Sequence, residues 1–88
     1  MINDKYLAEF IGTLVFIYVI IDTAAPLAIA TTLLAAILTA GKISGGHFNP
    51  AVTIAAFARG ALSKKELIPY VASQILGGLA AVNLKNIL

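Results

Sequence analysis

The feature that most constrains the fold is a polar, glycine-rich segment, Ser44–Thr53, which interrupts a chain of mostly apolar residues. Within this segment, Asn49 suits the N-cap of a helix, and Pro50 suits the first helical position, where a missing N–H costs nothing. We expect an apolar helix to follow over residues 50–58. At ~1.5 Å per residue this helix is roughly 15 Å long, about half of a ~30 Å hydrocarbon core. The pattern therefore predicts a re-entrant helix whose N-terminus points at the middle of a bilayer.

A loop at that depth restricts what can surround it. Irregular backbone inside a membrane persists only where it is buried in protein or lines a water-filled cavity. Gly45 and Gly46 permit tight turns that could aim backbone carbonyls into such a cavity. The segment thus indicates a pore or a solute site.

The composition supports a membrane protein. Hydrophobic residues make up 60% of the 88 residues and charged residues only 11%, outside the range of soluble domains. The alternative, a very apolar soluble bundle, would need polar helix faces, and residues 11–21 and 27–40 have almost none.

We therefore predict an all-α membrane protein in which residues 1–88 form one domain. The predicted elements are three transmembrane helices and the re-entrant helix, over residues 6–21, 27–41, 64–84 and 50–58. The first two spans are short, with roughly 15–17 apolar residues where about 20 are usual. Ser63 and Glu66 match a capping box, which predicts that the last span begins there.

Basic residues predict the orientation. With the N-terminus on the cytoplasmic side, that side would hold five of them, namely Lys5, Lys42, Arg59, Lys64 and Lys65. The opposite side would hold only Lys85. The positive-inside rule therefore favours a cytoplasmic N-terminus.

Several classes of function are excluded by the residues present. The chain has no cysteine and a single histidine, so we expect neither a metal site nor any other cofactor. No nucleophile–base pair, phosphate loop or pair of carboxylates is found, and an enzyme is not expected. The basic residues sit at span ends rather than in a patch that would bind nucleic acid.

Asn49 is the strongest candidate for binding a solute. As an N-cap its side-chain oxygen accepts from the helix start, which leaves its NH2 group free to donate. The partial positive charge of the helix N-terminus favours a neutral solute with a lone pair, such as water, over a cation. The alternative is a capping asparagine with no exposure.

Four further polar residues have expected roles. Glu9, about one turn into the first span, could accept N–H bonds from the loop at residues 42–48 and support it. His47 could line a pore as donor or acceptor, or hold the loop together by hydrogen bonds. For Gln74 and Asn83 we expect hydrogen bonds between helices rather than solute binding.

The segment Ser44-Gly45-Gly46-His47-Phe48-Asn49-Pro50-Ala51-Val52-Thr53 resembles the first signature loop of the aquaporin and aquaglyceroporin (major intrinsic protein) family. Residues 8–13 resemble the first helix of that family, and residues 70–78 its third. The resemblance covers nearly the whole chain but only the first half of the family's architecture, in which two inverted three-span halves bring two half-helices together at the midplane.

The resemblance implies roles for the loop. Asn49 would be one of two central donors to water, with Pro50 and Ala51 completing the motif that supports it. Gly45, Gly46, His47 and Phe48 would supply backbone carbonyls along the inner half of the channel, and Glu9 would brace the loop.

Two positions depart from the family pattern. Val52 follows this motif, whereas the filter arginine of the family follows the second one. Ile29 occupies the filter position where water-selective members usually carry a bulky aromatic residue.

Two functions remain open. The first is a channel subunit for water or a small neutral solute that needs a second half, supplied by a homo-oligomer or by a complementary chain. The second is a non-conducting truncated or structural membrane protein that keeps the half-channel fold.

Overall fold

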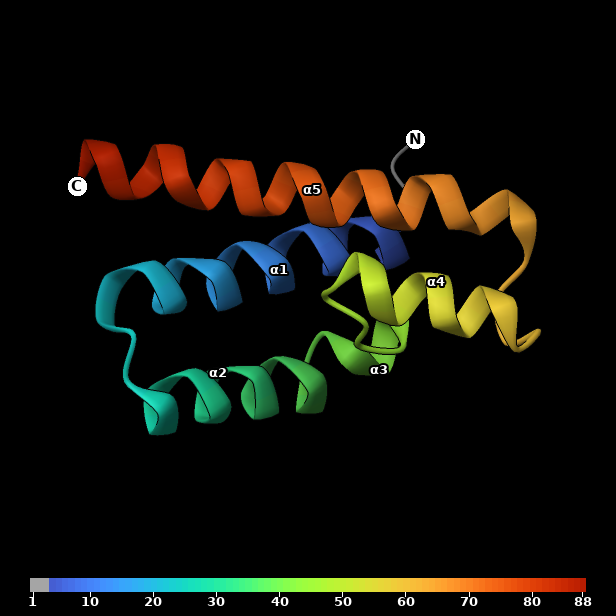
Figure 1. Cartoon of the computed structure of the whole chain (residues 1–88), viewed down its shortest axis with the longest axis horizontal. Coiled ribbons are helices and arrows are strands. Elements are labelled where there is room, and N and C mark those ends of the chain that lie inside the picture. Colours follow the sequence, from blue (N-terminus) through green and yellow to red (C-terminus); the bar gives the residue numbers. More distant parts are fainter. Residues whose placement is uncertain (1–3) are drawn as a thin grey trace.

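The computed structural model describes residues 4–88 as five helices joined by short loops (Figure 1). The helices are α1 (Asp4–Thr23), α2 (Pro26–Leu38), α3 (Gly41–Ser44), α4 (Pro50–Ala58) and α5 (Lys64–Ile87). No strand occurs in this described range. The chain is therefore an all-α protein, with α1 between α5 and α2 (Figure 1). Helix α3 packs beside one end of α1, and α4 packs against α5.

Helices α1 and α5 lie side by side and run in the same direction. Near their starts, Lys5 Nζ lies 2.5 Å from Glu66 Oε2, and near their ends, Lys85 Nζ lies 2.7 Å from Asp22 Oδ1. The pair of helices thus carries one ion pair at each end and an apolar stretch between them, as expected for helices that cross a bilayer.

Both of these helices are long and apolar enough to span a membrane. At ~1.5 Å per residue, the 20 residues of α1 extend about 30 Å, which matches the hydrocarbon core. The sequence placed this span at residues 6–21 and the last at 64–84, and the helices in the structure extend beyond these ranges to residues 4–23 and 64–87.

The second predicted span, residues 27–41, is shorter in the structure. Helix α2 has 13 residues and ends at Leu38, and a separate helical turn, α3, follows. The break falls at Thr39, whose hydroxyl donates to the carbonyl oxygen of Ala35 at 2.8 Å. The Thr39 backbone N–H still donates to the same oxygen at 3.1 Å, and the helix ends where the Thr39 backbone leaves helical geometry, with φ −106° and ψ −82°.

The capping box expected at α5 forms only in part. Ser63 is the N-cap residue, but its side chain accepts no backbone N–H of the helix. Its hydroxyl instead donates to Glu66 Oε1 at 3.2 Å, while Glu66 Oε2 binds Lys5. The carboxylate of Glu66 is thus used between helices rather than to cap its own helix.

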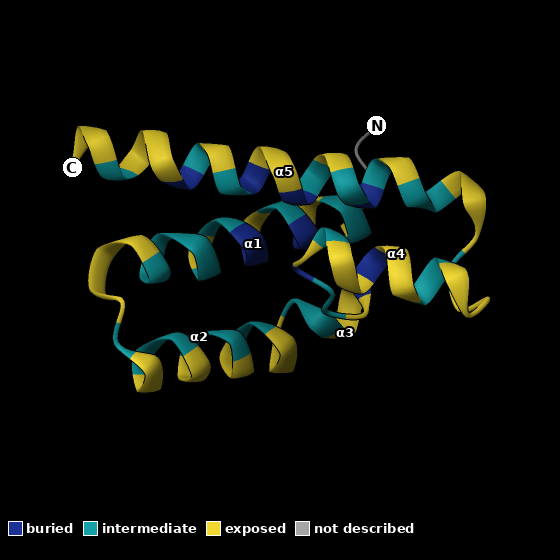
Figure 2. Ribbon diagram, viewed as in Figure 1, coloured by how far each residue is buried: buried dark blue, intermediate teal, exposed yellow. Residues whose placement is uncertain are grey.

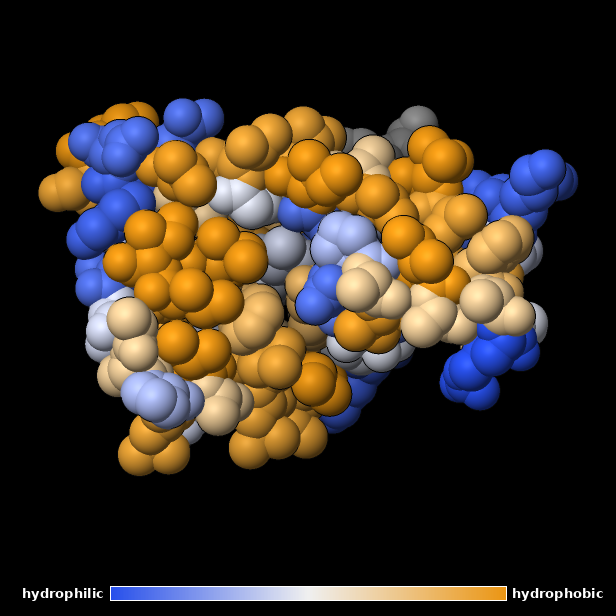
Figure 3. All heavy atoms as spheres, in the orientation of Figure 1, coloured by the Kyte–Doolittle hydropathy of each residue, from blue (hydrophilic) through white to orange (hydrophobic). Residues whose placement is uncertain are grey.

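Polar side chains form much of the core, and the outer surface is mostly apolar. Side chains that are at most 6% exposed include Glu9, Ser44, Thr53 and Gln74, whereas Leu27 is 80% exposed. The buried residues lie where α1, α5, α4 and the loop before α4 face one another (Figure 2). Apolar atoms cover most of the visible surface between hydrophilic ends (Figure 3). This inverted distribution suits a hydrocarbon solvent.

Candidate functional site

The loop before α4 is built on left-handed backbone. Gly45, Gly46 and Phe48 have φ values of 95°, 70° and 52°. Glycine adopts this region without strain, whereas phenylalanine does so rarely. The Phe48 side chain is only 2% exposed. Burial of its ring therefore holds the loop in a conformation that its backbone alone would not favour.

The carboxylate of Glu9 is the centre of the hydrogen bonds that hold this loop. It is fully buried on α1. Its Oε2 accepts from Ser44 Oγ at 2.6 Å and from the His47 backbone N–H at 3.1 Å. Its Oε1 accepts from the Phe48 backbone N–H at 2.7 Å and from Gln74 Nε2 at 2.8 Å. Two of these donors are loop N–H groups that have no helical partner, so Glu9 supplies acceptors that the backbone lacks.

Gln74 joins α5 to both α1 and α4. Besides donating to Glu9, its Nε2 donates to Thr53 Oγ1 at 2.7 Å. Thr53 is fully buried on α4, and its Oγ1 is also 2.8 Å from His47 Nδ1. Gln74 therefore makes the predicted bonds between helices, and it links the carboxylate to the histidine through one hydroxyl. The same prediction is wrong for Asn83, which is exposed and makes no side-chain hydrogen bond within residues 4–88.

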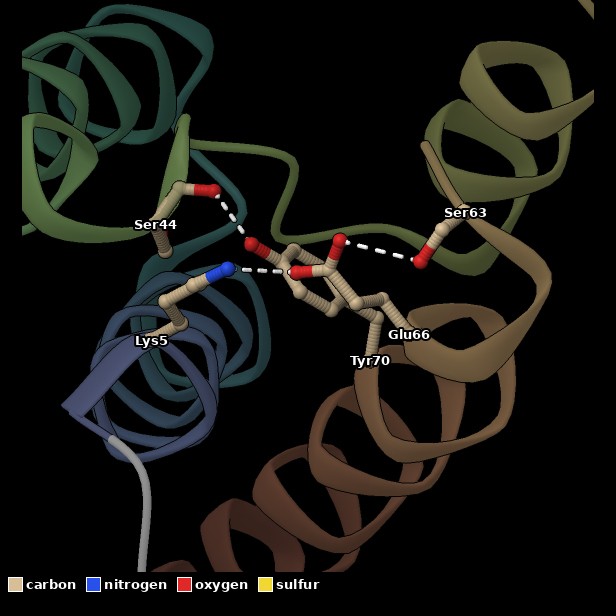
Figure 4. A network of polar contacts seen from close by, with 5 residues as sticks. All are labelled: Lys5, Ser44, Ser63, Glu66 and Tyr70. Carbon is tan, nitrogen blue, oxygen red and sulfur yellow. Dashed lines mark hydrogen bonds and ion pairs between the residues drawn. The ribbon is translucent and has the colours of Figure 1, made fainter. Parts of the chain in front are cut away.

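Tyr70 completes the support of the loop from α5. Its hydroxyl donates to the backbone carbonyl of Ser44 at 2.7 Å, and its ring centroid lies 5.1 Å from that of His47. The Lys5–Glu66 ion pair lies beside this bond, between the starts of α1 and α5 (Figure 4). The polar contacts thus continue from the buried loop to the end of the helix pair.

Asn49 is the N-cap of α4, and this prediction is confirmed. Its Oδ1 accepts the Ala51 backbone N–H at 2.8 Å, and Pro50 occupies the first helical position. The side chain is exposed, and its NH2 group donates to no other residue in the part of the chain that the structure describes. Near the start of α4 a hydrophilic patch interrupts the apolar surface (Figure 3). Asn49 therefore has donors available to an external group.

A groove of about 390 Å³ adjoins Asn49. It runs between α1, α5 and the start of α4, and apolar side chains such as Phe16 and Leu79 form much of its lining. Two buried polar atoms in lining residues, Thr13 Oγ1 and Gln74 Oε1, have no partner among residues 4–88. Such atoms are few in folded proteins, and each calls for an explanation.

The other candidate positions are separate from this groove. Ile29 is half-buried near the start of α2 and does not line the groove. Val52 is 45% exposed on α4. No group of three or more potential metal ligands occurs within residues 4–88.

Sequence reasoning assigned no role to Ser44, Thr53 or Tyr70, although all three are buried and hydrogen-bonded to the loop or its supports. Ser44 and Thr53 belong to the glycine-rich segment itself, which was the available signal. Their partners on the long helices, Glu9 for Ser44 and Gln74 for Thr53, lie 35 and 21 positions away in the sequence, so no local pattern could identify them.

Comparisons with known proteins cover almost the whole chain. The profile of the major intrinsic protein family matches residues 2–88. Aquaporin Z of Photorhabdus laumondii is 41% identical over 92 residues, an alignment that covers 88% of this chain and 40% of the relative. Glycerol uptake facilitator protein-like 6 of Lactiplantibacillus plantarum is 40% identical, with the same shares of the two chains.

Another relative has a higher sequence identity over a shorter alignment. Aquaporin-8 of Notomys alexis is 53% identical over 51 residues, which is 58% of this chain and 20% of the relative. No solved structure matches the chain significantly. The chain thus spans about two fifths of the length of the curated bacterial relatives that it matches.

Proposed function

The chain belongs to the major intrinsic protein family, and on this premise we propose that it is one half of a passive channel for water or a small neutral solute. The observation that carries the proposal is the state of Asn49. Its side-chain oxygen is occupied by the cap of α4, and its NH2 group is exposed with no partner among the described residues. An amide in this state can donate to a lone pair but offers no charge to an ion.

The helix end adds to this preference. The first N–H groups of α4 give its N-terminus a partial positive charge beside Asn49. A solute oxygen is attracted to such a position, whereas a cation is repelled. The names of the relatives, which include an aquaporin and a glycerol uptake facilitator, support a neutral solute with oxygen atoms.

A second half is part of the proposal because one re-entrant helix cannot enclose a pore. The groove beside Asn49 has a mainly apolar lining, and two of its lining residues have buried polar atoms without partners. The length of the relatives supports a second set of helices in opposite orientation. Another copy of the chain and a complementary chain are the two separate partners that experiment can distinguish.

One observation favours a non-conducting protein instead. The residues described contain a single re-entrant helix, and the NH2 group of Asn49 lies open rather than inside an enclosed path. A structural membrane protein that keeps this half of the fold would need no second half.

Osmotic shrinkage of proteoliposomes, followed by stopped-flow light scattering, tests the proposal. We expect vesicles with the assembled protein to be more water-permeable than empty vesicles. Asn49→Asp keeps a capping oxygen and the shape of the side chain but replaces the NH2 donor group with a carboxylate oxygen. We expect this variant to lower the water permeability of the vesicles severalfold. Asn83→Asp makes the same change at an exposed position of α5 and should leave permeability unchanged.

Cross-linking should first establish the assembly, and reporter tags on both termini should establish the orientation. With assembly established, a permeability equal to that of empty vesicles would exclude the channel and favour the non-conducting protein. A single orientation would exclude the antiparallel homodimer and leave the complementary chain. We expect the N-terminus on the cytoplasmic side, as the distribution of lysine and arginine predicts.

A further inference from the structure

A row of four side chains connects the buried carboxylate to the histidine of the loop. Gln74 Nε2 lies 2.8 Å from Glu9 Oε1 and 2.7 Å from Thr53 Oγ1, and Thr53 Oγ1 lies 2.8 Å from His47 Nδ1. The first three residues are at most 1% exposed. Bulk solvent therefore does not reach these three side chains. The polar hydrogen atoms of the row have to be assigned to the bonds between its members.

The direction of the first bond follows from Glu9. Its oxygens also accept from the Ser44 hydroxyl and from two backbone N–H groups, and the N–H groups can only donate. A carboxylate accepts and never donates. The amide of Gln74 must then turn its NH2 group towards Glu9, because its oxygen would place two acceptors 2.8 Å apart.

The remaining bonds follow in turn. The same NH2 group donates to Thr53 Oγ1, so the hydroxyl of Thr53 acts there as an acceptor. The hydroxyl has one hydrogen, and His47 Nδ1 is the other hydrogen-bond partner of its oxygen among the described residues. Thr53 therefore donates to Nδ1. A neutral imidazole nitrogen that accepts carries no hydrogen, which leaves the proton of His47 on Nε2.

The reverse order of bonds leaves more polar groups unsatisfied. It requires a protonated Glu9 and a turned Gln74 amide, with two N–H donors where Gln74 Oε1 now lies. That position is buried and has no partner in the described part of the chain. Two orphaned N–H groups are rarer in proteins than one carbonyl oxygen with an unused lone pair.

We propose that Thr53 and Gln74 are positioning residues that fix His47 in the tautomer with its proton on Nε2. The ring is half-buried, and Nε2 has no partner within residues 4–88. A Cβ atom on Gly45 would lie 3.7 Å from Nε2, so the glycine leaves this edge of the ring uncovered.

The consequence for solutes rests on the proposed function. In this tautomer His47 presents an N–H donor beside the loop, in addition to the donors of Asn49. Both residues would then select for a solute lone pair, as in water or an alcohol. A group that can only donate would find no partner at either side chain.

Solid-state NMR of bilayer-reconstituted protein labelled with 15N and 13C in histidine tests the tautomer directly. His47 is the only histidine, so one ring gives all the signals. At alkaline pH we expect a protonated Nε2 and an unprotonated Nδ1, distinguished by their bonds to Cδ2 and Cγ. Thr53→Ser keeps the hydroxyl and should keep this spectrum. Thr53→Val keeps the shape without the hydroxyl and should give signals of both tautomers.

The wild-type spectrum decides on its own, whether or not the valine variant folds. A proton on Nδ1 would overturn the proposal, and so would a folded Thr53→Val protein with the single wild-type tautomer. Neither measurement depends on conduction, so a vesicle assay without water flux would leave the tautomer assignment intact.

Discussion

A Cβ atom on Gly12 would lie 2.2 Å from Cε1 of Phe48, so the ring of the loop residue occupies the space that a side chain at position 12 of α1 would fill. This close approach explains how Phe48 keeps its positive φ of 52°. The ring is held against the helix backbone while Glu9 holds the Phe48 N–H. The glycine of α1 and the conformation of the loop thus depend on each other.

The first prediction concerns this contact. Gly12→Ala should destabilise the folded protein by about 1–3 kcal/mol, the usual cost of overpacking a filled core. Chemical unfolding in detergent micelles, followed by circular dichroism, would measure the loss. Combining Gly12→Ala with Phe48→Leu should cost less than the sum of the single changes, because the smaller side chain leaves room for the new methyl group. Strict additivity would contradict the contact.

The second prediction compares two adjacent glycines of α5. A Cβ on Gly77 would lie 2.6 Å from the backbone oxygen of Phe10, which cannot move without shifting α1, whereas on Gly78 its nearest neighbour is Ile17 Cγ1 at 3.9 Å. Gly77→Ala should therefore lower the thermal unfolding temperature clearly, and Gly78→Ala should leave it nearly unchanged. Equal shifts would show that the close packing of α1 and α5 is wrong.

The third prediction tests the buried carboxylate. Each carboxylate oxygen of Glu9 accepts from two donors. In Glu9→Gln, the amide oxygen can accept from the donors at one of these positions only, and the NH2 group faces the donors at the other. Each buried donor left without an acceptor costs about 1–3 kcal/mol. We expect a large loss of stability in the unfolding assay and faster hydrogen exchange at the His47 and Phe48 amides.

The matched control for this variant is Glu66→Gln. It makes the same change in a carboxylate that pairs with Lys5, and both side chains of that pair are partly exposed. Partly exposed ion pairs of this kind contribute little to the free energy of unfolding. A similar loss of stability in the two variants would argue against the special role of Glu9.

The fourth prediction concerns the tyrosine that supports the loop. Tyr70→Phe removes the donor to the buried carbonyl of Ser44 and should cost about 1–3 kcal/mol. Tyr18→Phe is the control, since the hydroxyl of Tyr18 has no hydrogen-bond partner among the described residues. Unfolding of both variants under the same conditions would compare them. A difference close to zero would show that the bond does not support the loop.

Much of the fold could be predicted because its signals are local. The N-cap residue Asn49 and the proline after it define the start of α4 at Pro50. The end of α2 was less predictable, because the apolar run continues beyond Leu38. The break occurs where the Thr39 backbone leaves helical geometry, with φ −106° and ψ −82°, which hydropathy does not reveal.

By itself, the sequence determined the all-α membrane class, the family and the helix capped by Asn49, because hydropathy and capping act over a few neighbouring residues. Only the tertiary structure decided which groups meet in the core. The partners of Glu9 lie 35 to 65 positions away, and no local rule could select them. The physical reason is that a buried carboxylate is satisfied only by donors that the packing of separate helices brings to it. The same packing brings Thr53 Oγ1 to 2.8 Å from Nδ1 of His47.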